Sequence, residues 1–119
     1  MKLIVFYSWQ SDLPNKDNRQ FIQSCLEKAM KKIHSNNTTI SDYIIESDSR
    51  DESGTPELAS TIFAKIDQCD VFIADVSIIN HEQVTRKVCN PNVLIELGYA
   101  SAKLGWEKIL CAYNLKYGK

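Results

Sequence analysis

The sequence lacks the phosphate-binding loops by which many nucleotide-binding enzymes are identified. Neither G-x-G-x-x-G nor G-x-x-x-x-G-K-[ST] can be built from its 4 glycines, which disfavours a dinucleotide dehydrogenase or an ordinary nucleoside triphosphatase. No serine stands in a G-x-S-x-G elbow, and the only histidines are His34, at a predicted helix end, and His81, in a predicted loop. A Ser-His-Asp hydrolase is therefore disfavoured as well.

The chain also lacks a surplus of positive charge and a long apolar run. Its formal net charge is -1, whereas a nucleic-acid-binding domain carries a surplus of Lys and Arg on one face. Its one basic cluster, Lys28, Lys31 and Lys32, is typical of the solvated side of a helix. No apolar run approaches the ~20 residues of a membrane span. We expect neither a nucleic acid polymer nor a membrane as a partner.

The 4 cysteines form no C-x-x-C pair. Cys25 and Cys111 fall in apolar patterns, so we expect buried free thiols. No spacing between cysteines and histidines matches a zinc site, and we expect no metal. With no signal peptide at the N-terminus, a reducing cytoplasm is the expected compartment.

What the sequence does contain is an alternation of strand and helix patterns over 119 residues. Strands are predicted at "KLIVFY", "TISDYIIES", "DVFIADV" and "KILCAYN", the third central and the second near an edge. Thr55-Pro56 and Asn90-Pro91 each pair a capping residue with proline at the first helical position, and Gly105 supplies a helix stop. The alternation predicts one α/β domain with a parallel sheet and right-handed crossovers.

Apolar residues at helical spacing mark the expected buried faces of three helices. These residues are Phe21, Ile22, Cys25, Leu26, Ala29, Met30 and Ile33 in the first helix, Leu58, Ala59, Ile62, Phe63 and Ile66 in the second, and Leu94, Leu97, Leu104 and the small Ser101 in the third.

A ligand site is expected at the carboxyl ends of the strands, where the winding of an open parallel sheet reverses. If the strand order is 2-1-3-4, this point lies between the first and third strands. The polar and aromatic residues that converge there are Tyr7, Ser8, Trp9, Asp75, Ser77, Asn92 and Glu96. A structural role stays open for each of the loop residues: Ser8 as a loop cap, Trp9 as a packing residue and Asp75 as a cap for backbone amides.

Glu96 is the one acid in the apolar helical stretch "NPNVLIELGYA". Asn92 and Glu96 are four residues apart and share a helix face, which passes beside the Leu94 and Leu97 stripe. We therefore expect Glu96 to be half-buried at the rim of a crevice, with the wet side of an amphipathic helix as the alternative.

Four segments in this order, "VFYSWQSD", "DSR" with "SGTPELASTIFAKID", "DVFIADVSIIN" and "NPNVLIELGYA", together resemble a bacterial TIR-like domain. The resemblance runs from about residue 3 to Asn114 and is greatest to the TIR modules of anti-phage effectors. It implies a flavodoxin-like sheet of order 2-1-3-4 with helices on both faces, and NAD+ as the substrate. It gives Glu96 the catalytic role and places Tyr7, Ser8 and Trp9 in the nucleotide pocket.

The resemblance also implies an assembly surface. Residues 48–56, with the charged side chains of Asp48 and Arg50, match a loop that gates the pocket and contacts a neighbouring copy; both charges could instead be only solvated loop charges.

Two departures from the family pattern stand out. Asn92 occupies a place that some relatives fill with an aromatic residue, and the usual fifth strand and last helix are missing. We therefore expect residues 1–119 to be the N-terminal module of a longer protein with a ligand-sensing domain.

The chemistry of NAD+ explains how one carboxylate can suffice. Its leaving group is a pyridinium that departs as neutral nicotinamide, so no proton donor is needed, and an ionised Glu96 stabilises positive charge on the ribose. The predicted function is an NAD+ hydrolase of anti-phage defence, active on self-association, with no cofactor. The alternatives are a nucleoside deoxyribosyltransferase-like enzyme and a non-catalytic adaptor that serves homotypic assembly only.

Overall fold

The computed structural model describes residues 1–47 and 56–118. Four strands and three α-helices alternate along this part of the chain, with two short 3-10 helices near its end. The strands are β1 (Lys2–Ser8), β2 (Asp42–Glu46), β3 (Val71–Asp75) and β4 (Ile109–Ala112), and the helices are α1 (Arg19–Asn36), α2 (Pro56–Gln68), α3 (Pro91–Leu104), η1 (Trp106–Lys108) and η2 (Leu115–Tyr117).

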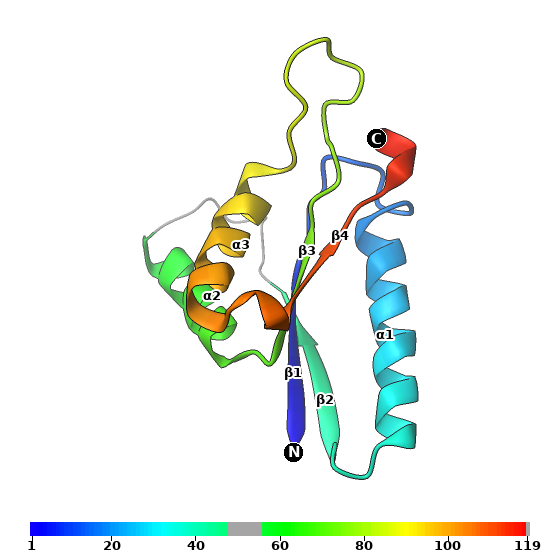
Figure 1. The fold of residues 1–119 in the computed structure, drawn as a ribbon, viewed down its shortest axis with the longest axis vertical. Helices are drawn as coiled ribbons and strands as arrows, with labels where there is room; N and C mark the ends of the chain where they lie inside the picture. The colour runs from blue at the N-terminus through cyan, green and yellow to red at the C-terminus, as the bar shows by residue number, and fades with distance from the viewer. Residues whose placement is uncertain (48–55, 119) are drawn as a thin grey trace.

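The strands form one parallel sheet of order β2-β1-β3-β4 (Figure 1). Both central strands are largely buried, whereas β2 and β4 lie at the edges. The predicted flavodoxin-like α/β arrangement and its strand order are confirmed. In this order the chain turns from β1 to β2 on one side and crosses back to β3 on the other, so the winding reverses between β1 and β3.

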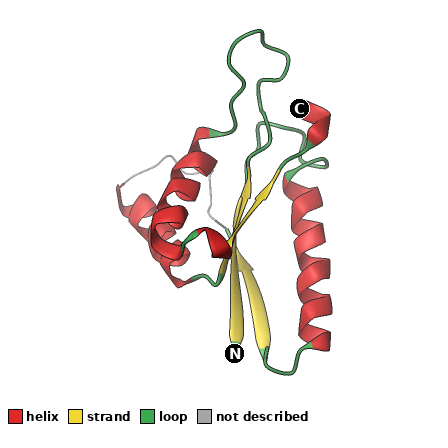
Figure 2. Cartoon of the chain, viewed as in Figure 1, coloured by secondary structure: helices red, strands yellow, loops and turns green. Residues whose placement is uncertain are grey.

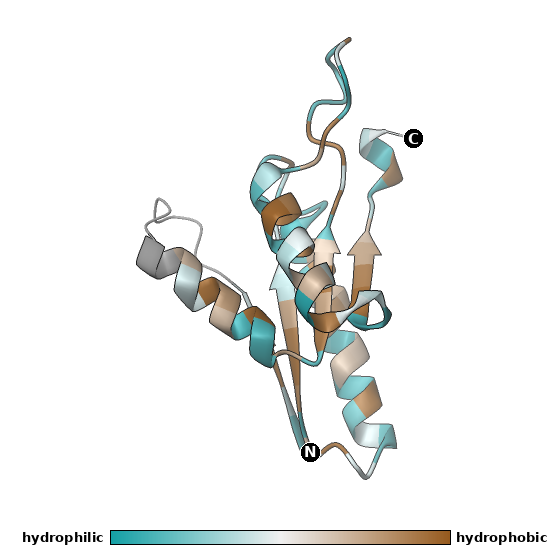
Figure 3. Ribbon diagram, turned by 60° about the vertical axis from the view of Figure 1, so that its left-hand side comes forward, coloured by the Kyte–Doolittle hydropathy of each residue, from teal (hydrophilic) through white to brown (hydrophobic). Residues whose placement is uncertain are grey.

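Helices cover both faces of the sheet, with α1 on one face and α2 and α3 on the other (Figures 1 and 2). Successive side chains of a strand point to opposite faces. In β1, Val5 and Tyr7 therefore pack with Met30 of α1, while Phe6 packs in a second cluster with residues of α2 and α3. The hydropathy colouring of Figure 3 shows the strands as the largely hydrophobic centre of the molecule.

The contact between Phe6 and Phe72 ties the two central strands together on the α2 and α3 face. Their rings stack with centroids 5.7 Å apart, and both residues are fully buried. Truncating a buried Phe to Ala costs roughly 3–5 kcal/mol, so this pair is a principal support of the strands that carry the candidate site.

Helix α1 buries a narrower stripe than its sequence predicts. Only Met30 is buried, with Leu26 half-buried one turn before it and Ile22 half-buried two turns before it. Phe21 remains 59% exposed, and Cys25 is exposed. A single helix lying over an open sheet meets it along one i, i+4, i+8 line, so apolar residues one position away face solvent.

The expected burial of Cys111 is also wrong, because β4 is an edge strand and the cysteine is exposed there. Cys69, at the end of α2, is buried among the residues of the α2 and α3 face. Burial raises the pKa of the Cys69 thiol to about 11. None of the described helices has the length and apolar character that crossing a membrane requires.

Candidate active site

The start of α3 is fixed by an asparagine cap and a proline. The side-chain oxygen of Asn90 accepts hydrogen bonds from the backbone N–H of Asn92 at 2.8 Å and of Val93 at 3.1 Å. Pro91 follows at the first helical position, as the sequence predicts. Such a cap stabilises a helix by about 1 kcal/mol. The Asn90 amide also donates to the Asp12 carboxylate at 2.5 Å, which joins the helix start to the loop after β1.

Helix α3 is turned by one residue from the orientation that its leucines predict. The residues it buries are Val93, Glu96 and Ala100, whereas Leu94 is 49% exposed. Glu96 is only 5% exposed, so the prediction of a half-buried side chain at a rim underestimates its burial. Leucines lie beside the predicted stripe and beside the observed one, so their spacing does not decide which face of α3 is buried. The observed stripe contains a carboxylate, whose burial costs free energy unless a partner stabilises it.

That partner is Ser8, the last residue of β1. The Ser8 hydroxyl donates a hydrogen bond to Oε1 of Glu96 at 2.7 Å, between residues that are 88 positions apart in the chain. Ser8 is fully buried, so only Glu96 of this pair is in contact with solvent. A hydroxyl that donates to a carboxylate orients it and stabilises its charged form. The structure thus holds one carboxylate at the carboxyl end of a central strand, beside the point where the winding reverses.

Asp75, at the end of β3, is the centre of a second buried network. Its Oδ2 accepts from the amides of Gln10 at 3.0 Å and Asn18 at 2.8 Å. Its Oδ1 accepts from the backbone N–H of Ser77 at 3.1 Å and from the Ser77 hydroxyl at 2.6 Å. A carboxylate offers about four acceptor positions, and all four are used here. Asp75 therefore joins the loops after β1 and β3.

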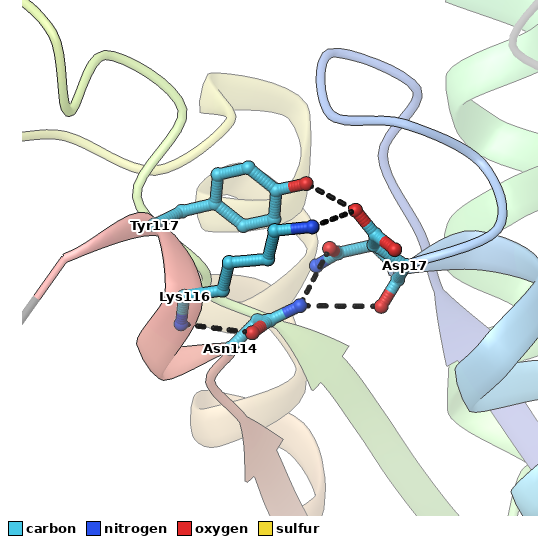
Figure 4. A network of polar contacts seen from close by, with 5 residues as sticks. Asp17, Asn114, Lys116 and Tyr117 are labelled. Atoms are coloured by element: carbon cyan, nitrogen blue, oxygen red, sulfur yellow. Dashed lines mark hydrogen bonds and ion pairs between the residues drawn. The ribbon is translucent and has the colours of Figure 1, made fainter.

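The same network reaches the end of the described chain (Figure 4). The Asn114 amide, just after β4, donates to Asn18 Oδ1 at 3.1 Å. The Asp17 carboxylate accepts from Lys116 Nζ at 3.1 Å and from the Tyr117 hydroxyl. These hydrogen bonds, from Tyr117 first and Lys116 second, lower the pKa of Asp17. The ends of β1, β3 and β4 are thus joined into one polar layer.

Tyr7 and Trp9, both predicted to line the nucleotide pocket, lie on the other face of the sheet from Glu96. Both are buried in the cluster that packs against α1. The Tyr7 hydroxyl donates to the backbone oxygen of Arg19 at 3.3 Å, and the Arg19 guanidinium lies over the Trp9 ring. The alternation of side chains along β1 explains the separation, because Ser8 and its two neighbours point in opposite directions. The structure does not bring these aromatic rings to Glu96.

The remaining predicted residues are placed differently. Asn92 is exposed on the first turn of α3, although the same helix buries Glu96 one turn later. Asp48 and Arg50 lie outside the described residues. Among residues 1–47 and 56–118, no group of three or more His, Cys, Asp or Glu side chains is arranged to hold a metal ion.

Gln10, Asn18 and Asn114 belong to the polar layer, although no motif in the sequence marks them as site residues. Each follows the end of a strand or precedes a helix, where polar residues are common. Asn18 directly precedes α1, yet its side chain makes no cap hydrogen bond. It binds Asp75 and Ser77 instead. For Gln10 and Asn114, an amide at or soon after the end of a predicted strand is the available signal.

The chain matches no model of a known protein family and no curated protein. It is similar in structure to a 2-desoxiribosyltransferase from Leishmania mexicana, with a TM-score of 0.50 and 18% sequence identity. The similarity covers 93% of this chain and 64% of that chain. At this level of identity it shows a shared α/β fold.

Proposed function

We propose that the chain is an enzyme that cleaves the N-glycosidic bond of a nucleotide, with NAD+ as its substrate and Glu96 as its catalytic residue. The observation that carries the proposal is the hydrogen bond between Ser8 and Glu96, at the carboxyl end of β1. A buried carboxylate costs free energy unless it is paired or hydrogen-bonded, and in open α/β sheets ligands bind at this edge. Together these facts favour a reactive group over a solvated one.

The reaction follows from the leaving group. The bond between C1 of the ribose and the pyridinium nitrogen breaks, and its electron pair passes to the ring, which departs as neutral nicotinamide. The positive charge that develops on the ribose is stabilised by the negative Glu96 carboxylate. Water then adds to C1 and releases a proton to solvent. A single carboxylate is enough, because no leaving oxygen has to be protonated.

The structural similarity favours a second candidate within the same chemistry. A 2-deoxyribosyltransferase exchanges the base at C1 of a deoxyribose and also needs stabilisation of positive charge at that carbon. The two candidates differ in substrate and in acceptor, since water completes the hydrolysis and a second base completes the transfer. The residues that stabilise the charge would be the same pair, Ser8 and Glu96.

The experiment that separates them offers the purified chain NAD+ and, separately, a deoxynucleoside with a second free base. Nicotinamide and the exchanged base are quantified by chromatography for the wild type, for Glu96→Gln and for Glu107→Gln, an exposed acid that serves as the matched control. Release of nicotinamide that is lost only in Glu96→Gln supports the proposal. Base exchange with intact NAD+ supports the transferase, and no conversion of either substrate contradicts both.

The resemblance to TIR-like modules adds an expectation about assembly. We propose that activity requires self-association through residues 48–56, within a defence effector whose other part senses a ligand. Turnover per subunit should then rise with protein concentration. A turnover per subunit that stays constant over a roughly hundred-fold range of protein concentration would show that activity does not require self-association. Association without any cleavage of NAD+ would identify an adaptor.

A further inference from the structure

A cavity on the α1 face opens beside the candidate active site. Its volume is about 360 Å³, and it lies where the ends of β1 and β2 meet the start of α1. Tyr7 and Trp9 supply its aromatic part, and amide side chains of α1 and the preceding loop, with Ser47 after β2, supply its polar part. Among the described residues that line it, Arg19 is the only charged one.

Arg19 is an exposed residue that makes two contacts here, one through its side chain and one through its backbone. Its guanidinium carbon lies 3.6 Å from the centroid of the Trp9 ring, and Trp9 is only 3% exposed. The Tyr7 hydroxyl donates to the Arg19 backbone oxygen at 3.3 Å and thereby ties the start of α1 to β1. A guanidinium that stacks by its flat face keeps its N–H donors, which lie in its plane, for other partners. Such a planar fork matches two oxygens of a phosphate group.

The cavity and Glu96 lie on the two sides of one strand end. Tyr7 and Trp9, which line the cavity, are the chain neighbours of Ser8, which binds Glu96. Because Ser8 stands between Tyr7 and Trp9 in the chain, a substrate that crosses the tip of β1 could reach both places. In NAD+ the diphosphate follows the ribose that bears nicotinamide, and it carries the negative charge that a guanidinium attracts.

We propose that Arg19, supported by Trp9, binds a phosphate group of the substrate and so selects a phosphorylated nucleotide over a nucleoside. The identity of the substrate in this inference rests on the proposed function. The anion site itself rests on the cavity and on the contact between Arg19 and Trp9. Arg19 is a binding and specificity residue; it does not take part in breaking the glycosidic bond. The cavity therefore favours NAD+, which carries phosphate, over a deoxynucleoside, which carries none.

The kinetic test compares NAD+ with nicotinamide riboside, which carries the same scissile bond and no phosphate. Arg19→Gln should lower kcat/KM for NAD+ by roughly ten- to hundred-fold, the range of a lost charge-assisted hydrogen bond. The value for nicotinamide riboside should stay unchanged. Arg86→Gln, at an exposed position of the loop between β3 and α3, is the matched control. Equal losses on both substrates would overturn the assignment.

A binding test needs no activity. Trp9 and Trp106 are the 2 tryptophans of the chain, and Trp106 is 62% exposed. In a Trp106→Phe background the fluorescence of Trp9 is observed alone while inorganic pyrophosphate is added. We expect a saturable change, lost in Arg19→Gln and weakened in Arg19→Lys, which keeps the charge without the fork.

The two tests fail in distinguishable ways. If NAD+ is not cleaved but pyrophosphate produces the Arg19-dependent change, the anion site stands and the proposed function falls. If pyrophosphate produces no change, or the same change in Arg19→Gln, the anion site is overturned whatever the activity. Thermal unfolding of each variant, with Arg19→Lys as the conservative substitution, separates loss of binding from loss of the fold.

Discussion

Replacing Ser8 by alanine removes the hydroxyl that donates to Glu96 at 2.7 Å and leaves the rest of both residues in place. A hydrogen bond to a charged group contributes about 1.5–3 kcal/mol. Because both residues are buried, water cannot readily replace the missing donor. We therefore expect Ser8→Ala to lower the free energy of unfolding by about 1.5–3 kcal/mol, or the midpoint temperature by roughly 4 °C per kcal/mol for a chain of this length.

The measurement is urea unfolding of a double-mutant cycle. Glu96→Gln keeps an acceptor for the Ser8 hydroxyl but removes the charge, so Ser8→Ala should cost about 1 kcal/mol less in that background. Ser24→Ala, at an exposed position of α1, should change stability little and serves as the control. An equal cost of Ser8→Ala with and without the carboxylate would refute the idea that the hydroxyl serves a charged partner.

Two further predictions concern thiol reactivity and the dependence of stability on pH. With an aromatic disulfide reagent near pH 8, exposed Cys25 and Cys111 should react before Cys69, because burial raises the pKa of the Cys69 thiol to about 11. Mass spectrometry of the labelled peptides gives the order of reaction. Early labelling of Cys69 would contradict its buried position. The pKa of Asp17 is lowered mainly by its hydrogen bond from Tyr117, so its contribution to stability is present above the usual pKa range of an aspartate and is lost as the pH falls through the lowered value. Asp17→Asn should therefore be less stable than the wild type at neutral pH, with a difference that shrinks in strong acid; a difference independent of pH in urea unfolding would show that the charge of Asp17 does not matter.

The sheet was predictable because its signals are local and repeated. Continuous apolar runs, each followed by a helical pattern, predict parallel strands, and the more polar second run correctly predicts an edge. The start of α3 was equally predictable, because Asn90 is a typical capping residue and Pro91 is typical of the first helical position. These features depend on the backbone and on near neighbours in the chain.

The faces of the helices were harder to predict because they depend on distant partners. Hydrophobic spacing placed Leu94 in the core and Glu96 at its rim, whereas the structure reverses them. The deciding contact is with Ser8, 88 positions away, which no local pattern contains. In the same way, Asn18 occupies the position before α1 but binds Asp75, the last residue of β3.

The separation of Ser8 from Tyr7 and Trp9 has a simpler cause. All three were expected to face one pocket, yet a strand alternates its side chains between two faces. The alternation follows from the sequence positions alone, and it separates Ser8 from Tyr7 and Trp9. It also changes the account of the site, because the aromatic residues now belong to a cavity that carries Arg19 and not to the immediate surroundings of Glu96.

The central claim is that the buried Glu96 carboxylate stabilises charge at a glycosidic carbon, and a single-turnover measurement of nicotinamide release from NAD+ tests it most directly. The account predicts that Glu96→Gln slows release by about a hundred-fold or more, as for loss of one electrostatic contact to a transition state, while Glu107→Gln releases nicotinamide at the wild-type rate. Equal rates for wild type and Glu96→Gln, with both proteins folded and assembled, would contradict it.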